Sequence, residues 1–130
     1  MCLETFKTQP SNDKTGYGWK VFKLKSNRQL RFQFRQHNNS FIVPINKWLI
    51  NKNKESICTQ YGNYHSGFHI FTNYESAVLY ENGWSPLGLC IRKVQYKGIN
   101  VIGKQYSDDL TQLKTLVVRE MLVLPKKENE

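Results

Sequence analysis

Apolar and cationic side chains alternate with a period of two between Trp19 and Arg35, and this pattern limits the fold more than any other feature. Ser26-Asn27 interrupts the alternation, and the apolar positions on either side are Phe22, Leu24, Leu30, Phe32 and Phe34. Successive side chains of a β-strand point to opposite faces, so the pattern predicts a β-hairpin with one face turned to the core. A chain that contains this hairpin has to build a sheet around it.

Further segments have the apolar composition of strands or extended chain. The last of them, Leu116–Leu124, is interrupted only by Arg119 and Glu120 and ends at Pro125, so we expect it to lie at the centre of the sheet. The other predicted segments are Phe41–Val43, Gly67–Phe71, Leu87–Tyr96 and Ile99–Ile102.

Two short helices are predicted between these strands. Pro44 suits the first turn of a helix, because apolar residues follow it at helical spacing at 45, 48 and 49. Thr72 and Glu75 form a capping-box pattern, which predicts a second helix over 73–81 that ends at Asn82-Gly83. Residues 51–66 are rich in Asn, Lys, Ser and Gly and indicate a long loop.

The chain of 130 residues is long enough for one domain, and its 39% of apolar residues can bury a core despite a mean hydropathy of −0.59. We therefore predict a single α+β domain over 1–130, mainly an antiparallel sheet of about six short strands with two short helices. Residues 1–16 are expected to form an irregular lead-in, and residues 126–130 a frayed tail.

No apolar run approaches the roughly 18–20 residues of a membrane helix. The N-terminal residues lack the basic and apolar regions of a signal peptide, so we expect a cytoplasmic protein without a membrane partner. Three widely spaced cysteines exclude a disulfide framework and a four-cysteine zinc site.

The formal charge of +9 is concentrated in one half of the chain: residues 1–60 carry +8 and residues 61–130 carry +1. Six cations and no acid lie within 20–35. Strand alternation places Lys23 and Lys25 beside Arg31 and Arg35 on the next strand, where like charges repel unless an anion bridges them. These four residues are the predicted phosphate-binding positions, and a solvated sheet face that resists edge pairing is the alternative. The six cations are Lys20, Lys23, Lys25, Arg28, Arg31 and Arg35.

Aromatic residues are set between glycines in Gly16–Trp19 and again in Tyr61–His69. Such rings can stack on a base or a nicotinamide, or they can close the ends of a small core. Tyr17, Trp19 and His69 are the residues that we predict near a base.

Two further side chains are candidates for chemistry. His65 and His69 have the spacing of metal ligands on a helix, but Gly67 lies between them, and no metal site is predicted. Glu120 lies within an apolar strand and needs a partner, and alternation turns Arg119 to the other face. Glu120 is therefore either ion-paired with another cation or a general base in a cleft, with His69 as the second catalytic candidate.

Three short motifs carry a resemblance. Gly67–Thr72 followed by Ala77 and Tyr80, then Val94–Gly98, then Val117–Met121, resemble small, poorly characterised proteins of bacteriophages and bacteria, as do the opening Met1-Cys2-Leu3 and the Trp19–Phe22 strand.

The strand that enters a helix at Phe68–Ala77 and the late Glu120 also resemble the ADP-ribosyltransferase superfamily. That resemblance implies an NAD-consuming fold with a catalytic glutamate on a late strand. This chain is short and lacks the His or Arg that the family's first strand carries, which favours a related fold that keeps a nucleotide pocket without the chemistry.

We therefore expect a phage or mobile-element accessory protein in the host cytoplasm that binds an anionic nucleotide or a nucleic acid. Binding could serve counter-defence by sequestering a nucleotide signal. It would need no cofactor, and NAD would enter only as a substrate or ligand. The alternatives are an ADP-ribosyltransferase-like enzyme that uses Glu120 and His69, and a module that docks an acidic host protein on the same basic face.

Overall fold

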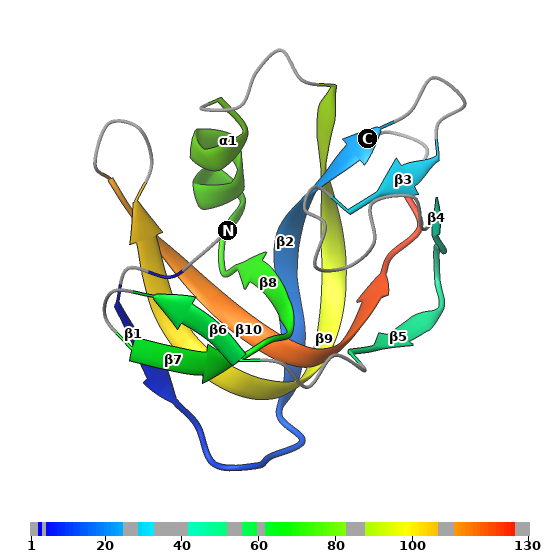
Figure 1. Ribbon diagram of the computed structural model, residues 1–130. Helices are drawn as coiled ribbons and strands as arrows, with labels where there is room; N and C mark the ends of the chain where they lie inside the picture. Colours follow the sequence, from blue (N-terminus) through cyan, green and yellow to red (C-terminus); the bar gives the residue numbers. More distant parts are fainter. Residues whose placement is uncertain are drawn as a thin grey trace.

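The computed structural model describes residues 3, 5–24, 29–32, 42–51, 56–59, 62–82, 88–106 and 111–126. Within them lie ten strands and one helix (Figure 1). They are β1 (Thr5–Thr8), β2 (Thr15–Leu24), β3 (Leu30–Arg31), β4 (Ile42–Val43), β5 (Trp48–Ile50), β6 (Ser56–Thr59), β7 (Gly62–His65), β8 (Phe68–Phe71), α1 (Tyr74–Asn82), β9 (Leu89–Tyr106) and β10 (Gln112–Val123).

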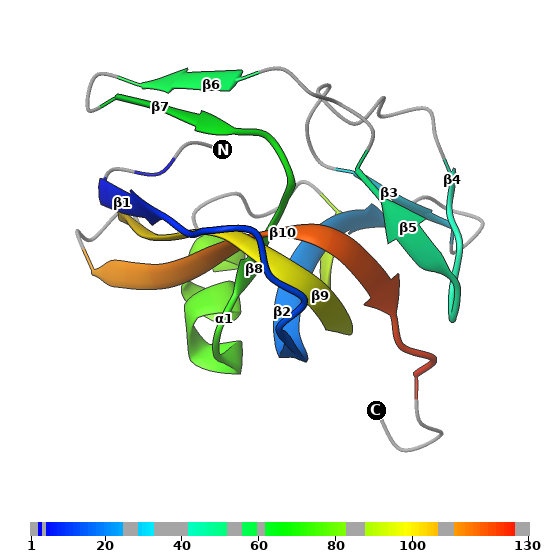
Figure 2. The same cartoon turned by 90° about the horizontal axis from the view of Figure 1, so that it is seen from below.

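The prediction of an α+β fold with two helices is wrong, because the described residues form a mostly antiparallel β structure with α1 as their single helix. Eight strands belong to one sheet, and β6 and β7 form a second, two-stranded sheet. Figure 2 shows this second sheet as a separate layer above β1 and β10. None of the helices in the described part of the chain is long and apolar enough to span a membrane.

The helix predicted after Pro44 is replaced by a bend and strand β5. Asn46 takes a positive φ of 60°, and its backbone N–H donates to the Val123 carbonyl at 2.7 Å. Trp48 and Leu49 then pair with β10 opposite Leu122 and Met121. Hydrogen bonds offered by the edge of β10 therefore override a local spacing that also fits a helical turn.

The long loop predicted over 51–66 contains the β6–β7 hairpin, in which Ser56 pairs with His65 and Thr59 with Gly62. The strands are too polar to show an apolar alternation, so no period-two signal marks them. Likewise, residues 5–8 form β1 within the segment predicted to be irregular.

Four strands of the large sheet pair in a closed circuit, in which β9 pairs with β10, β10 with β8, β8 with β2, and β2 again with β9. The β2–β8 contact is a single pair, Trp19 opposite Phe71. Gly18 permits this approach, since a Cβ at that position would lie 2.8 Å from the Phe71 carbonyl oxygen. The fold is thus a small closed barrel with short strands added at its edges.

β9 is one strand of 18 residues rather than the two predicted segments. Its pairing with β10 shifts register between Val117 and Val118, which leaves Asn100 as a bulge, and Gly98 has a φ of +80°. A bulge and a left-handed glycine bend a strand without ending it, so the predicted break is a bend.

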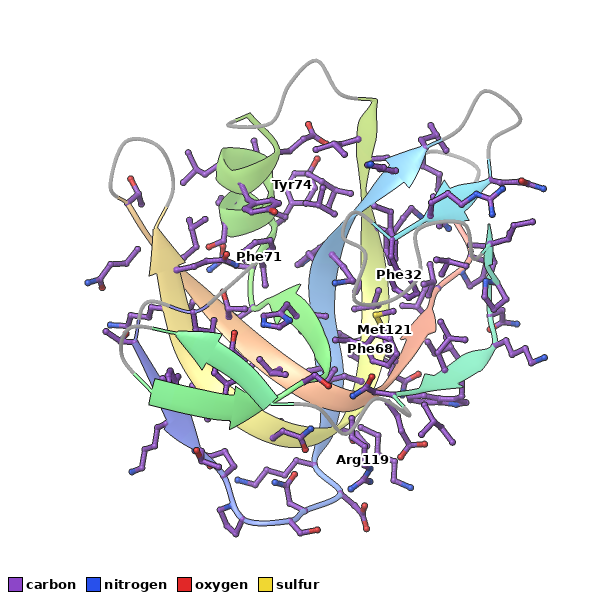
Figure 3. All side chains as sticks on the ribbon, viewed as in Figure 1. Phe32, Phe68, Phe71, Tyr74, Arg119 and Met121 are labelled. Atoms are coloured by element: carbon purple, nitrogen blue, oxygen red, sulfur yellow. The ribbon has the colours of Figure 1, made fainter. Side chains whose placement is uncertain are left out.

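The apolar residues form three clusters. The largest fills the barrel and includes Phe32, Phe68 and Met121, which Figure 3 shows close together. A second lies under α1, where Ala77 packs with Val21. The third joins Tyr64 of β7 to the outer face of β9 and β10.

The predicted hairpin of residues 19–35 is confirmed in its described part, because Lys23 pairs with Arg31 and Leu24 with Leu30. Phe22, Leu30 and Phe32 are buried as predicted. Leu24, in contrast, is 43% exposed at the end of the strand.

Candidate functional site

Tyr17 and Trp19 lie on one face of β2, two residues apart, on the side of the sheet that α1 partly covers. The antiparallel register with β9 places Lys93 directly opposite Trp19. Tyr74, the first residue of α1, contacts the Trp19 ring edge to face. We call these four residues, Tyr17, Trp19, Tyr74 and Lys93, the aromatic patch.

The Lys93 ammonium lies over both strand aromatics. Its Nζ is 5.2 Å from the centroid of the Tyr17 ring and 5.8 Å from that of Trp19. The Trp19 and Tyr74 centroids are 5.0 Å apart, edge to face. The Trp19 ring thus contacts both Tyr74 and Lys93, whereas the Tyr17 ring contacts Lys93.

The patch is open to solvent. Tyr17 is 58% exposed and Tyr74 is 48% exposed, although large aromatic side chains are usually well buried. Lys93 is exposed as well. Among the described residues, the only ion pairs are those of Arg119, so the ammonium has no carboxylate partner there.

The predicted basic face is only partly described. Lys23 lies on the same face of β2 as Trp19 and directly opposite Arg31, whose Nη2 donates to Gln29 Oε1 at 3.1 Å. Lys23 lies four positions after Trp19, a distance of roughly 13 Å along a strand. Lys25 and Arg35, the other two predicted phosphate ligands, lie outside the described residues.

Lys20 does not belong to that surface, because it points to the opposite face of β2 and is only 7% exposed. Its Nζ donates to the His69 carbonyl at 2.8 Å. Burial lowers the pKa of this lysine to about 7. Lys20 was counted among the six cations of the segment but not among the four predicted phosphate-binding positions, and alternation places it on the same face as Phe22.

His69 is 1% exposed, and its Nε2 is 3.0 Å from the Tyr64 hydroxyl. That hydroxyl also accepts a hydrogen bond from the Leu3 amide at 3.1 Å. The imidazole therefore helps to join β7 and the N-terminal segment to the sheet. Because it is buried, it is not part of the exposed aromatic patch.

Glu120 has the partner that alternation seemed to forbid. The Arg119 Nη2 lies 3.2 Å from Glu120 Oε2, and it also contacts Asp13 Oδ1 at 2.6 Å. Alternation fails here because Gly98 leaves room for the guanidinium, and a Cβ on this glycine would lie 2.9 Å from Arg119 Cζ. The hydrogen bond that Arg119 donates to Asp13 is the main reason why the pKa of the Asp13 carboxyl is lowered.

The two predicted catalytic residues, Glu120 and His69, have different partners in the structure. The carboxylate is engaged by Arg119, and the imidazole is buried against Tyr64 on a different face. In the described ranges, no group of three or more His, Cys, Asp or Glu residues could hold a metal ion.

Comparison with protein families, curated proteins and solved structures finds no match for this chain. The two resemblances seen in the sequence therefore stay predictions, and the geometry of the aromatic patch is the basis for a functional proposal.

The sequence identified two members of the patch and missed two. Lys93 enters through the pairing of β2 with β9, and no local pattern specifies that register. Tyr74 falls within the predicted helix over 73–81, but no motif in the sequence singled it out, and it is the exposed first residue of α1. A lysine in a strand, such as Lys93, is too common to indicate a binding site by itself.

Proposed function

We propose that this protein binds single-stranded nucleic acid, with bases stacked on Tyr17 and Trp19 and a phosphate held by Lys93. The observation that carries the proposal is one ammonium lying over two aromatic rings on an open strand face. Exposed rings beside cations are the usual means of binding single strands, because every base has a stacking face.

The spacing of the rings suits successive nucleotides. Residues two apart on a strand lie roughly 6–7 Å from each other. An unstacked strand can present neighbouring bases at such intervals, whereas the bases of a duplex are stacked on one another and cannot reach the rings. Single strands are therefore favoured over duplexes.

The energies favour a base over the ammonium as the partner of the rings. An exposed cation–π contact is worth about 0.5–1 kcal/mol, and stacking of a base on an aromatic side chain about 1–3 kcal/mol. A base can thus displace Lys93 from the Tyr17 ring, and the flexible lysine stem keeps the charge near the phosphate that follows the base.

The charge distribution supports an anionic polymer. The chain carries +9, and +8 of this lies in residues 1–60, which include β2 and β3. Lys23 and Arg31 continue the face of β2 beyond the patch. Phosphates contacting these residues would release counterions, so binding should weaken as salt rises.

The test measures fluorescence anisotropy of a labelled thymidine decamer with the full chain at several salt concentrations. Tyr17→Ala is expected to weaken binding roughly thirtyfold, which corresponds to about 2 kcal/mol, the midpoint of the stacking range, and Tyr17→Phe to retain it. Lys93→Gln should reduce the slope of log affinity against log salt by about one phosphate contact, ~0.7 for a single strand.

The control is Ile50→Ala, an equally open strand position at 57% exposure on β5. It should bind as the unaltered protein does. Absence of binding at low salt, or an unchanged affinity in Tyr17→Ala, rules the proposal out. Equal affinity for a mononucleotide and for the decamer would replace nucleic acid by a nucleotide ligand.

A further inference from the structure

A second basic surface lies at the opposite end of the long strands. There, β1, β9 and β10 form a groove of about 240 Å³. Three lysines line it together with four uncharged residues: Lys7, Lys104 and Lys114, and Thr5, Phe6, Ile102 and Gly103. We call it the lysine groove. It shares no residue with the aromatic patch, and it can bind an anion whether or not the patch binds a base.

The register of the three strands gathers these side chains on one face. Lys104 is paired with Thr5 on β1 and with Lys114 on β10, so the three form a row across the sheet. Lys7 lies two residues beyond Thr5 on the same face of β1, opposite Ile102. Directly opposed residues have Cβ atoms about 4.5–5.5 Å apart, close enough for two ammonium groups to hold one anion.

No acid balances these charges within the part of the chain that the structure describes. Lys104 Nζ donates to the neutral Gln112 Oε1 at 3.1 Å, and all the ion pairs found there belong to Arg119. All three lysines are exposed. Like charges directly opposite on neighbouring strands destabilise a sheet, and an anion bound between them would remove that repulsion.

The three lysines of the groove favour phosphate as the ligand. Lysines are mobile point charges with three donors each, which suits a compact group with several negative oxygens. The Thr5 side chain adds a hydroxyl donor at the groove. Because the groove is shallow and bounded by the edge strand β1, it could admit a chain of phosphoryl groups that continues past it.

We propose that the lysine groove binds phosphoryl groups, supplied either by a free oligophosphate or by the backbone of a nucleic acid. The recognised chemistry is the same for both sources, namely several anionic oxygens spaced by one phosphorus atom. Row geometry across β1, β9 and β10 selects for adjacent phosphates over a single monovalent anion.

Inorganic triphosphate is the first probe, titrated into the full chain at low salt by calorimetry. Lys104→Gln/Lys114→Gln is expected to weaken binding at least tenfold. The matched control is Lys14→Gln/Lys126→Gln, which removes the same two charges from exposed positions outside the groove. Equal losses in both double variants, or no binding of triphosphate to the unaltered chain, overturn the proposal.

The thymidine decamer is the second probe, and it distinguishes the two sources. If the groove contacts a nucleic acid backbone, the Lys104/Lys114 variant weakens decamer binding and lowers its salt slope by about 1.4, or two single-strand phosphates. If the groove takes free oligophosphate, decamer binding is unchanged while triphosphate binding is lost. Tyr17→Ala should leave triphosphate binding intact in either case, so failure of this proposal and failure of the base-stacking proposal can be told apart.

Discussion

Lys20 has an ionisable group inside the barrel with a backbone carbonyl as its hydrogen-bond partner. Its ammonium also lies 6.0 Å from the centroid of the Phe22 ring. A carbonyl and a ring face compensate only part of the cost of removing a charge from water, so the pKa falls to about 7 from 10.5. At neutral pH this lysine is close to its own midpoint of titration.

The lowered pKa predicts a pH dependence of stability. Below pH 7 the lysine is protonated in both states, and the full cost of burial acts against folding. Between about pH 7 and 10.5 the folded protein releases the proton while the unfolded chain keeps it, so the free energy of unfolding rises with pH. The comparison is with Lys20→Met, which has no proton to release.

Urea unfolding at pH 6, 7.5 and 9 measures the effect. Over this range the unaltered protein is expected to gain on the order of 1–3 kcal/mol relative to Lys20→Met, since each unit of pH contributes up to about 1.4 kcal/mol. All other charges titrate alike in the two proteins. A difference that stays constant with pH would contradict the prediction.

At the scale of elements, the capping pattern predicted helix α1 but identified the wrong N-cap residue. The helix was predicted to begin at Thr72 with Glu75 as its capping partner. In the structure Asn73 Oδ1 accepts the Ser76 amide at 2.8 Å, so Asn73 is the N-cap, and the Thr72 amide donates to the Lys114 carbonyl. The sequence offers two capping residues in a row, and the sheet engages the first.

This distinction can be tested with two neighbouring substitutions. Asn73→Ala should lower the free energy of unfolding by about 1 kcal/mol, the usual cost of losing an N-cap. Thr72→Ala should cost less, because the hydrogen bond of Thr72 to β10 comes from its backbone. Thermal unfolding followed by circular dichroism compares them, and a larger loss in Thr72→Ala would restore the predicted cap.

Elements were predictable where one segment alone carries the signal. The hairpin alternates cleanly, Leu116–Leu124 is apolar throughout except at two residues, and both belong to strands of the structure. β5 and β6–β7 were missed because their pairing partners, and not their own composition, decide their conformation. The site follows the same rule: Tyr17 and Trp19 share a face by alternation, whereas Lys93 joins them only through long-range pairing.

At the scale of the whole molecule, barrel closure depends on the one contact between β2 and β8. Gly18 lies beside it, with the Phe71 carbonyl oxygen and the Ile70 side chain where a Cβ would be, at 2.8 and 3.0 Å. Neither a backbone oxygen nor a packed core side chain can move far. Any side chain at position 18 must therefore push β2 and β8 apart.

Gly18→Ala is expected to destabilise the protein by about 1–3 kcal/mol, the usual cost of overpacking. Chemical denaturation measures the loss. Tyr17→Ala, next to it on the same strand but open to solvent, should change stability by no more than ~0.5 kcal/mol. If the two variants unfolded at the same urea concentration, closure at Gly18 would not be tight.

The pairing of β2 with β9 also sets the order of events during synthesis. A ribosome completes residues 15–24 long before residues 89–97, which are their hydrogen-bonding partners. β10, which pairs with β9 and β8, is made after both of them. The nascent chain therefore carries β2 without its main partner until β9 has emerged, and the barrel can close only after β10 has emerged as well.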